Sequence, residues 1–412
     1  MKIDKYWKSA LKIIPGGNNF LSKNPNRFQS KNWPTYFSKS KGCIIWDLNN
    51  KKYYDFSLMG VGTNVLGYRN QKVDNAVKAT INKGNMTTLN SPEELELAKM
   101  LVKIHPWAQM VKFARTGAEA SAIAIRLARA YNKKSKVIVC GYHGWHDWYL
   151  SAKFMKNNKL ETHLFSNLKT DGVPKFLKGN TYSVTYNDIE TIKKIIKKDK
   201  DISSIIMEVE RDKKPKSNYL GDIRKICNKN NICLIFDECT SGFRETFGGI
   251  HLKYRINPDI ALFGKAIGNG YSITSVVGKK RMMLKSNNTF ISSTFWSERI
   301  GYTAGIATLR EMKRVKSWQI VKTRGKYIKQ SLSKIAKKNG LSIVFHGLDS
   351  LIRFELKGIK KINYIKIITD EMLKRKFLAN DLIYVSVSHS KRLIDSYIKN
   401  MDQIFRKISN KI

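Results

Sequence analysis

The sequence predicts an α/β protein whose main domain has a mainly parallel sheet covered by helices. Four apolar runs of strand type lie in the middle of the chain, at 136–140, 203–208, 232–238 and 259–264. Segments with helical spacing separate them, for example 118–131 and 220–231. Alternation of this kind is typical of a parallel sheet with helices on both faces, and it puts ligand sites at the carboxyl ends of the strands.

The two ends of the chain do not share this alternation. A chain of 412 residues is long enough for a large core and more than one domain. We expect an amino-terminal segment at 1–55, a large domain at 56–310 and a smaller α+β domain at 311–412, completed by the amino-terminal segment.

Charge and composition narrow the class of protein. The formal net charge is +44, which favours either a polyanion partner or a general compositional drift toward lysine. The lysines are spread over nearly every segment without an arginine-aromatic cluster, so we expect no specific nucleic-acid partner. The five cysteines form no C-x-x-C pair, and no apolar stretch reaches about 18 residues. We therefore expect a cytoplasmic enzyme with no metal site and no membrane partner.

Two adjacent carboxylates, Asp237 and Glu238, end the apolar run at 232–238. Acids at this place serve magnesium in phosphate-hydrolysing enzymes, but those enzymes need a glycine loop that ends in Gly-Lys-Ser/Thr. Here Gly264-Lys265 is followed by Ala266, which disfavours such an enzyme. A second interpretation is that Asp237 caps the next helix.

Lys265 offers a third interpretation, because it follows the next apolar run at 259–264. A lysine at the rim of a sheet is partly desolvated, which lowers its pKa and makes it a nucleophile toward carbonyl groups. With Asp237 at a neighbouring strand end, the pair indicates pyridoxal phosphate. Lys265 would form the Schiff base, and Asp237 would pair with the pyridinium nitrogen.

A phosphate site is predicted at the start of the helix at 118–131. Thr116, Gly117 and Ala118 come directly before it, where backbone N–H groups and the helix dipole face an anion. The same residues also fit an ordinary helix start, with Thr116 and Glu119 as a capping box, and the two interpretations are compatible. Tyr142, in "GYHGWHD", is either a ring that stacks on the cofactor or an aromatic packed on the core.

Taken together, these motifs resemble the class III, fold-type-I pyridoxal-phosphate aminotransferases, in the branch that contains glutamate-1-semialdehyde 2,1-aminomutase. The resemblance covers about three quarters of the chain and is carried by "IPGG", "KGCIIWDLNNKKYYDF", "RTGAEASAIAIRLARAY", "YHGWHD", "DECTSGFR", "PDIALFGKAIGNGYSITSVVG" and "AGIATL". It implies a seven-stranded type of sheet in the large domain and pyridoxal 5'-phosphate as the cofactor. Lys265 and Asp237 are then the catalytic residues.

The resemblance also implies the remaining contacts to the cofactor. Thr116, Gly117 and Ala118 match the phosphate loop, Tyr142 matches the stacking residue, and Cys239 matches a position that covers the other face of the ring. Glu208, at the end of the run at 203–208, is included among the cofactor contacts. Thr294 matches a threonine that reaches the phosphate bound by the neighbouring subunit, which implies a homodimer.

Several substrate-side positions depart from the family. Lys23 stands where the aminomutase has an arginine for the substrate carboxylate, and lysine lacks the bidentate fork. The loop after Glu208 reads "VERDKK", where the family commonly has a proline and then an asparagine near the cofactor. Trp296, Glu298 and Arg299 replace a stretch of small residues. These changes leave the cofactor chemistry in place and alter the substrate loops.

Three functions follow as alternatives. The first is an aminotransferase that uses a small-molecule amine donor and a carbonyl acceptor, with a sugar-like or surface-glycan precursor as substrate. The second is a glutamate-1-semialdehyde 2,1-aminomutase, which moves the amino group within one molecule. The third is a non-catalytic polyanion-binding protein on the same scaffold, which the presence of both Lys265 and Asp237 disfavours.

Overall fold

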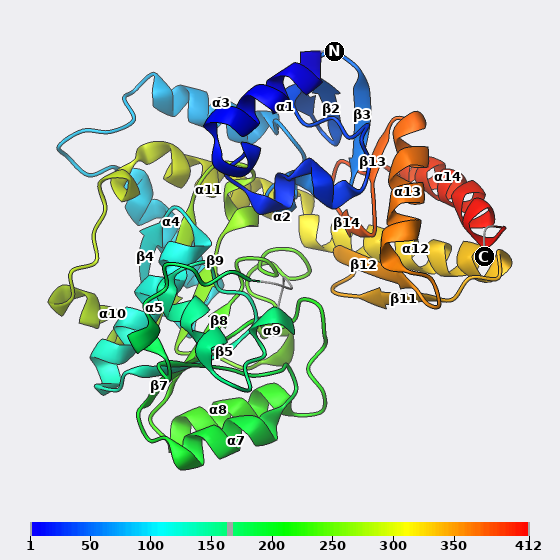
Figure 1. Cartoon of the computed structure of the whole chain (residues 1–412). Helices are drawn as coiled ribbons and strands as arrows, with labels where there is room; N and C mark the ends of the chain where they lie inside the picture. Colours follow the sequence, from blue (N-terminus) through cyan, green and yellow to red (C-terminus); the bar gives the residue numbers. More distant parts are fainter. Residues whose placement is uncertain (1, 163–167, 411–412) are drawn as a thin grey trace. The chain divides into compact units, whose positions relative to one another are not determined.

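The computed structural model describes residues 2–162 and 168–410, and the chain divides into two compact units (Figure 1). One unit contains residues 1–74 and 314–412, and the other contains residues 75–313. Residues 56–74 thus fall in the first unit, whereas the boundaries drawn from the sequence put them in the large domain. Backbone hydrogen bonds explain why they belong to the first unit. The carbonyl oxygens of Ser57 and Val65 accept hydrogen bonds of 2.8 Å from the N–H groups of Tyr384 and Val387.

The second unit is built on a seven-stranded sheet with the order β4-β10-β9-β8-β7-β5-β6. Its strands are β4 (Met110–Ala114), β5 (Lys136–Cys140), β6 (Thr181–Ser183), β7 (Ile202–Met207), β8 (Cys233–Asp237), β9 (Ile260–Phe263) and β10 (Thr274–Gly278). Only β10 runs against its neighbours, so the sheet is mainly parallel, as the sequence predicts. The central strands are buried along their whole length, which explains their unbroken apolar runs.

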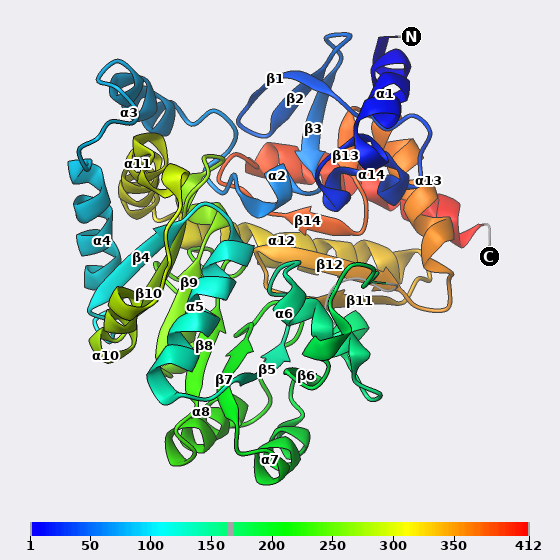
Figure 2. The ribbon, with the colours of Figure 1, turned by 60° about the vertical axis from the view of Figure 1, so that its left-hand side comes forward.

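Helix α5 (Gly117–Asn132) crosses one face of this sheet (Figure 2). Its small and aliphatic residues recur every three or four positions, and Ala120, Ala124, Leu127 and Ala128 are fully buried. The other helices of this unit are α4 (Pro92–Ile104), α6 (Asp147–Leu150), α7 (Ile189–Lys198), α8 (Tyr219–Lys229), α9 (His251–Tyr254) and α10 (Lys280–Met283). Helices α3 (Gln71–Ile81) and α11 (Arg299–Val315) contain the two boundaries between the units.

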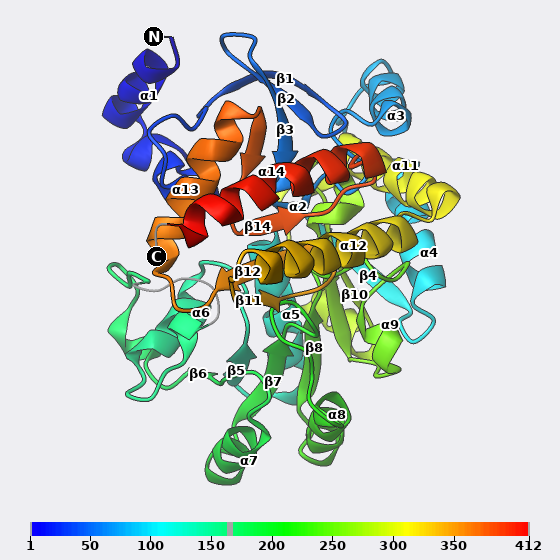
Figure 3. The ribbon, with the colours of Figure 1, turned by 90° about the vertical axis from the view of Figure 1, so that its right-hand side faces the viewer.

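The first unit combines both ends of the chain, as expected for the smaller α+β domain. Strand β13 (Phe377–Ala379) pairs in parallel with β3 (Lys52–Phe56), which continues into β2 (Ile44–Asp47) and β1 (Phe37–Lys41). A second sheet contains β11 (Ile343–His346), β12 (Leu351–Leu356) and β14 (Leu382–Tyr384). Helices α12 (Ser317–Lys338) and α14 (Lys391–Ser409) lie side by side (Figure 3). The unit also contains α1 (Lys2–Ile13), α2 (Met59–Gly62) and α13 (Lys361–Lys374).

The parallel strands β5, β7, β8 and β9 all end at one rim of the second unit's sheet. Of the predicted site residues, Asp237 is the last residue of β8, and Tyr142, Glu208 and Lys265 follow the ends of β5, β7 and β9. All five cysteines are buried free thiols. Within residues 2–162 and 168–410, no helix combines the length and the apolar character needed to cross a membrane.

Candidate active site

Asp237 is the last residue of β8, and its side chain is buried at the rim of the sheet, 6% exposed. One oxygen, Oδ2, accepts a hydrogen bond of 2.8 Å from Nδ1 of His143, and Oδ1 accepts the N–H of Cys239 at 3.1 Å. Burial by itself would raise the pKa of Asp237, but the bond and charge of His143, the Cys239 N–H and the charge of Lys265 together lower it. Asp237 is therefore a buried carboxylate that stays ionised.

Glu238, the neighbouring acid, has a different environment. Its carboxylate accepts bonds from Nδ1 of His251 at 2.5 Å, from the hydroxyl of Ser241 at 3.2 Å and from the backbone N–H of Ile250. These bonds tie the turn after β8 to α9, so Glu238 has a structural role. Of the two adjacent acids, Asp237 is the one that shares its surroundings with Lys265.

Lys265 follows β9, the strand next to β8, and starts the short helix η7 (Lys265–Gly268). Its backbone has a positive φ of 45°, a conformation that non-glycine residues rarely adopt. The Nζ amine donates a hydrogen bond of 2.7 Å to the hydroxyl of Thr240. Burial, and after it the positive charge of Arg211, lower the pKa of Lys265. A lysine in this state has the reactivity of an amine nucleophile.

The capping box predicted at the start of α5 is present. Thr116 is the N-cap residue and forms a capping box, because its hydroxyl accepts the Glu119 N–H at 3.3 Å and its own N–H donates to Glu119 Oε2 at 2.7 Å. The N–H groups of Gly117 and Ala118 belong to the first helical turn, where backbone donors have no acceptor within the helix. This end of a 16-residue helix is suited to hold an anion.

Cys239 connects the start of α5 with the Lys265 strand. A Cβ atom added at Gly117 or at Gly264 would lie 3.4 Å from Cys239 Sγ in each case. Burial, followed by the charge of Asp237, raises the pKa of the thiol well above its usual value, so Cys239 is neutral. Gly144 approaches α5 as well, because a Cβ atom there would lie 2.7 Å from the Cβ of Ala118.

Tyr142 and Glu208 occupy the ends of β5 and β7. The Tyr142 ring is partly buried, and it meets the Tyr149 ring edge-on with centroids 6.0 Å apart. Burial, together with the charge of Asp237, raises the pKa of Tyr142. The backbone N–H of Tyr142 donates to Glu208 Oε2 at 3.4 Å. Glu208 therefore lies against the loop that carries Tyr142.

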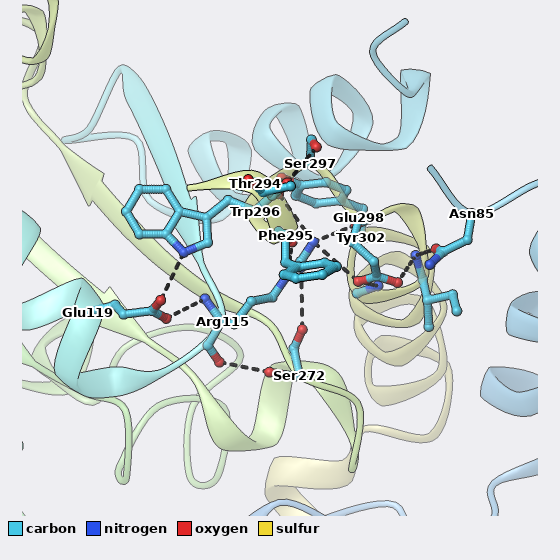
Figure 4. Close-up of polar contacts among 12 residues, drawn as sticks. Asn85, Arg115, Glu119, Ser272, Thr294, Phe295, Trp296, Ser297, Glu298 and Tyr302 are labelled. Atoms are coloured by element: carbon cyan, nitrogen blue, oxygen red, sulfur yellow. Dashed lines mark hydrogen bonds and ion pairs between the residues drawn. The ribbon is translucent and has the colours of Figure 1, made fainter. Parts of the chain in front are cut away.

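Thr294 begins the short helix η9 (Thr294–Ser297). Arg115, which directly precedes the N-cap residue of α5, links this helix to α5 (Figure 4). The guanidinium of Arg115 donates to the carbonyl oxygens of Phe295 at 2.8 Å, Trp296 at 3.1 Å and Glu298 at 2.5 Å. It also pairs with the Glu298 carboxylate at 3.2 Å. The Thr294 side chain itself is exposed.

Three residues that the sequence reasoning left without a role belong to this site. His143 lies next to Tyr142 in the loop after β5 and forms a hydrogen bond with Asp237. Its place after a buried strand was the sequence signal that could have indicated this role. Its other ring nitrogen, Nε2, is buried without a hydrogen-bond partner among the described residues. The Thr240 hydroxyl accepts a hydrogen bond from the Lys265 amine, and Arg115 holds the Thr294 segment by hydrogen bonds. No local pattern indicated these two contacts.

The sequence and the fold are similar to those of known proteins. The sequence model of the family described as "Aminotransferase class-III" matches residues 27–405. The chain is 33% identical to the 3-aminobutyryl-CoA aminotransferase of Cloacimonas acidaminovorans (strain Evry) over 83% of this chain and 80% of that protein. It is 31% identical to the glutamate-1-semialdehyde 2,1-aminomutase of Wigglesworthia glossinidia brevipalpis over 99% of this chain and 98% of that protein.

Solved structures share the fold. The PLP internal aldimine form of the FumI protein of Sphingopyxis sp. MTA144 superposes with a TM-score of 0.88 and 22% identity, covering 98% of this chain and 96% of that one. An omega-transaminase from Sphaerobacter thermophilus superposes with a TM-score of 0.85 and 19% identity, covering 98% and 97% of the two chains.

Proposed function

Since this chain belongs to the class III aminotransferase family, whose enzymes use pyridoxal phosphate, we propose that it transfers an amino group from a small-molecule amine donor to a carbonyl acceptor. The observation that carries this proposal is the pairing at one rim of a buried, ionised Asp237 with a lysine amine of lowered pKa, Lys265. An acid that only capped a helix would have no reason to share its surroundings with such an amine.

The residues at the rim fit pyridoxal phosphate. Lys265 supplies the amine that such a cofactor needs, and Asp237 supplies a carboxylate for the ring nitrogen. We assign the phosphate to the start of α5, where Gly117 and Ala118 offer N–H groups beside Thr116. Cys239 and Tyr142 are proposed to cover the two faces of the ring, and Glu208 to contact it from β7. The close approach of Cys239 to Gly117 and Gly264 supports this assignment.

The chemistry is divided between the cofactor and the chain. Bound pyridoxal phosphate supplies an electron-withdrawing ring that stabilises negative charge on the carbon next to the transferred nitrogen. Lys265 acts at its Nζ atom, which takes a proton from one carbon and returns it to another as general base and acid. Its lowered pKa keeps a larger neutral fraction of this amine available. Thr240 accepts a hydrogen bond from Nζ and so orients it.

Asp237 and His143 act as a unit on the other side of the site. Asp237 is ionised, so it would stabilise a positive charge on the ring nitrogen of bound pyridoxal phosphate. Nδ1 of His143 holds one carboxylate oxygen in place at 2.8 Å, and the Cys239 N–H holds the other. This fixes the orientation of the carboxylate before the substrate arrives.

An aminomutase is the second candidate, because full-length relatives carry the name glutamate-1-semialdehyde 2,1-aminomutase. Lys23, at the position of the aminomutase arginine, favours the aminotransferase over this candidate. The sugar-like or surface-glycan substrate expected from the altered loops remains a prediction.

We further propose that the enzyme is a cytoplasmic homodimer. The five free, buried thiols support a reducing compartment. Large exposed apolar side chains of the second unit support a partner, since Phe290 is 87% exposed, Leu89 82% and Phe295 68%. Thr294 precedes Phe295 directly, which supports the proposal that it reaches the phosphate bound by the partner.

A half-reaction experiment tests the proposed function. Purified protein loaded with pyridoxal phosphate is mixed with a panel of amines, and the visible absorbance of the cofactor is followed for conversion to the pyridoxamine form. An aminotransferase then needs a carbonyl acceptor from a second panel, which includes keto acids and keto sugars, to return to the first form. An aminomutase converts glutamate-1-semialdehyde without any acceptor. Failure of every amine to convert the cofactor would contradict the proposed function.

A further inference from the structure

The loop after β7, one of the departures from the family pattern, brings a cation to the rim. Residues 209–213 follow Glu208, and within them Arg211 Nη1 lies 2.8 Å from Glu208 Oε1. Both side chains are only 13% exposed. The second carboxylate nearby, Asp212, lies farther from the guanidinium, at 3.9 Å. Glu208 therefore helps to hold Arg211 in position by a close ion pair.

Glu208 also determines which part of the rim Arg211 faces. Its Oε2 atom accepts the N–H of Tyr142 at 3.4 Å, and a Cβ atom added at Gly141 would lie 2.8 Å from that same oxygen. The strand before it, β7, lies between β8 and β5 in the sheet. Arg211 is thus held between the strand that ends in Asp237 and the loop that carries Tyr142.

The electrostatics agree with this position. After burial, the charge of Arg211 is the largest influence that lowers the pKa of Lys265, and it also opposes the rise in the pKa of Tyr142 and Tyr149. Lys265 follows β9, whereas Tyr142 and Tyr149 both belong to the connection after β5. The Arg211 charge therefore acts on groups from two neighbouring parts of the rim.

Other residues of the loop also hold it in place. The carboxylate of Glu210, 1% exposed, pairs with Lys253 Nζ at 2.9 Å and accepts the hydroxyl of Tyr254. The carbonyl oxygen of Val209 accepts the hydroxyl of Tyr186. The two residues before Arg211 thus anchor this part of the loop.

We propose that Arg211 is a substrate-binding residue, which takes a carboxylate carried by the amine substrate, with Glu208 as the residue that positions it. The planar guanidinium has five N–H donors in a fork that matches a carboxylate, which a lysine such as Lys23 does not offer. The inference rests on the proposed function and names its substrate class: amines whose carbon skeleton also bears a carboxylate.

Binding of unreactive carboxylates gives a test that needs no turnover. Acetate, propanoate, butanoate and pentanoate, with the matching alcohols as uncharged controls, are titrated into the cofactor-loaded enzyme by calorimetry. We expect at least one carboxylate to bind, and Arg211→Gln to weaken it by about tenfold or more, as for a charge-assisted bond. Arg211→Lys should restore part of the affinity. Lys213→Gln, an exposed lysine in the same loop, removes one positive charge and should change nothing.

The half-reaction supplies the second readout. With γ-aminobutyrate and butylamine as a matched pair, wild type should prefer the carboxylated amine, and Arg211→Gln should lose that preference through KM. Equal losses in Arg211→Gln and Lys213→Gln, an unchanged preference in Arg211→Gln, or no binding of any carboxylate by wild type would overturn the inference. Absence of cofactor conversion with every amine would instead overturn the proposed function, so the two failures are distinguishable.

Discussion

The indole Nε1 of Trp296 lies 3.0 Å from Oε1 of Glu119, so a residue of η9 bonds directly to the capping box of α5 (Figure 4). The other oxygen of the same carboxylate, Oε2, accepts the N–H of Thr116 at 2.7 Å and the N–H of Arg115 at 3.0 Å. Trp296 is one of the bulky residues that replace the small residues of the family. The long indole side chain therefore connects the Thr294 segment to the proposed phosphate site by a hydrogen bond.

Trp296→Phe should lower the free energy of unfolding by about 1 kcal/mol, because it keeps the ring and removes one hydrogen bond. Burial by itself would raise the pKa of Glu119, but the bonds from Trp296, Thr116 and Arg115 lower it below 4.5. A carboxylate whose pKa is lowered by folding stabilises the folded state at pH values above its pKa in the unfolded chain. This stabilisation is lost as the pH falls toward the pKa in the folded state. The difference between variant and wild type should therefore shrink in acid.

Chemical denaturation at several pH values measures this difference. Trp145→Phe is a suitable control, since Trp145 is 69% exposed and its substitution should leave stability unchanged. A stability difference for Trp296→Phe that stays constant from neutral pH to acid would contradict the role given to Glu119.

Lys265→Ala should remove catalysis and spare the fold. The substitution deletes the amine that we propose as base and acid, so turnover should fall by at least about 10²–10⁴-fold. The positive φ of 45° adds a small strain to any residue at this place and does not prevent folding. Steady-state kinetics measures the turnover, and circular dichroism shows whether the variant is folded. Ordinary turnover in a folded Lys265→Ala protein would rule out this assignment.

Asp237→Asn separates a partner of the cofactor from a helix cap. The amide oxygen can still accept the Cys239 N–H, so the fold should persist, but the negative charge is lost. We expect the cofactor to bind and turnover to fall sharply. If Asp237 were only a cap, Asn would replace it with little effect on activity.

Asp259→Asn is the matched control for this substitution. Asp259 is also a buried carboxylate, 3% exposed, but it precedes β9 at the opposite end of the strand from Lys265 and pairs with Arg224 and Lys279. Its loss should reduce stability and leave turnover per folded molecule unchanged. Equal turnover in wild type and Asp237→Asn would favour the cap.

The sequence predicted the central strands and the position of the candidate site residues at their ends, because both depend on local pattern. β5, β7, β8 and β9 are apolar runs, and their parallel order places the residues that follow them at one rim. β4, β6 and β10 were not predicted as strands. Lys112 interrupts β4, and β6 has three residues. Which side chains pair across the rim depends on loop directions that no local pattern specifies. The contacts of His143 and Arg211 therefore became visible only in the structure.

Two buried histidines should make the protein sensitive to acid. His389 donates from Nε2 to the carbonyl of Asp55 at 2.7 Å and accepts the Ser386 N–H at Nδ1. His105 bonds the Leu101 carbonyl through Nδ1 and accepts the Gly249 N–H at Nε2. Both rings are thus held neutral, and burial lowers each pKa from 6.5 to about 4.

The sign of this effect follows from proton counts. Between pH 6.5 and about 4 the unfolded chain binds protons at these histidines and the folded chain does not. Stability is full above pH 6.5 and falls toward pH 4, by up to about 3 kcal/mol for each histidine. His389→Gln keeps a donor and an acceptor but cannot titrate, so its denaturation profile should be flatter in this window. A profile as steep as that of wild type would contradict the assignment.

The last prediction concerns Thr294 and a second subunit. Thr294 is exposed in the single chain, yet Arg115 and Trp296 hold its segment at the start of α5 instead of leaving it loose. Phe290 and Phe295 on the same segment are 87% and 68% exposed, and large apolar side chains of this kind are usually covered in an assembly. If the partner's phosphate receives the Thr294 hydroxyl, cofactor affinity must depend on dimerisation.

We therefore expect the cofactor to be released when the protein is diluted below the dimer dissociation constant. Visible absorbance measures the bound cofactor, and sedimentation measures the fraction of dimer. Thr294→Ala should weaken cofactor binding by about tenfold while the dimer persists, because it removes one bond to a charged group. Ser292→Ala removes an exposed hydroxyl two residues earlier and should have no effect. A monomer that binds the cofactor at full strength would disprove the shared site. Equal cofactor affinity in wild type and Thr294→Ala would remove Thr294 from it.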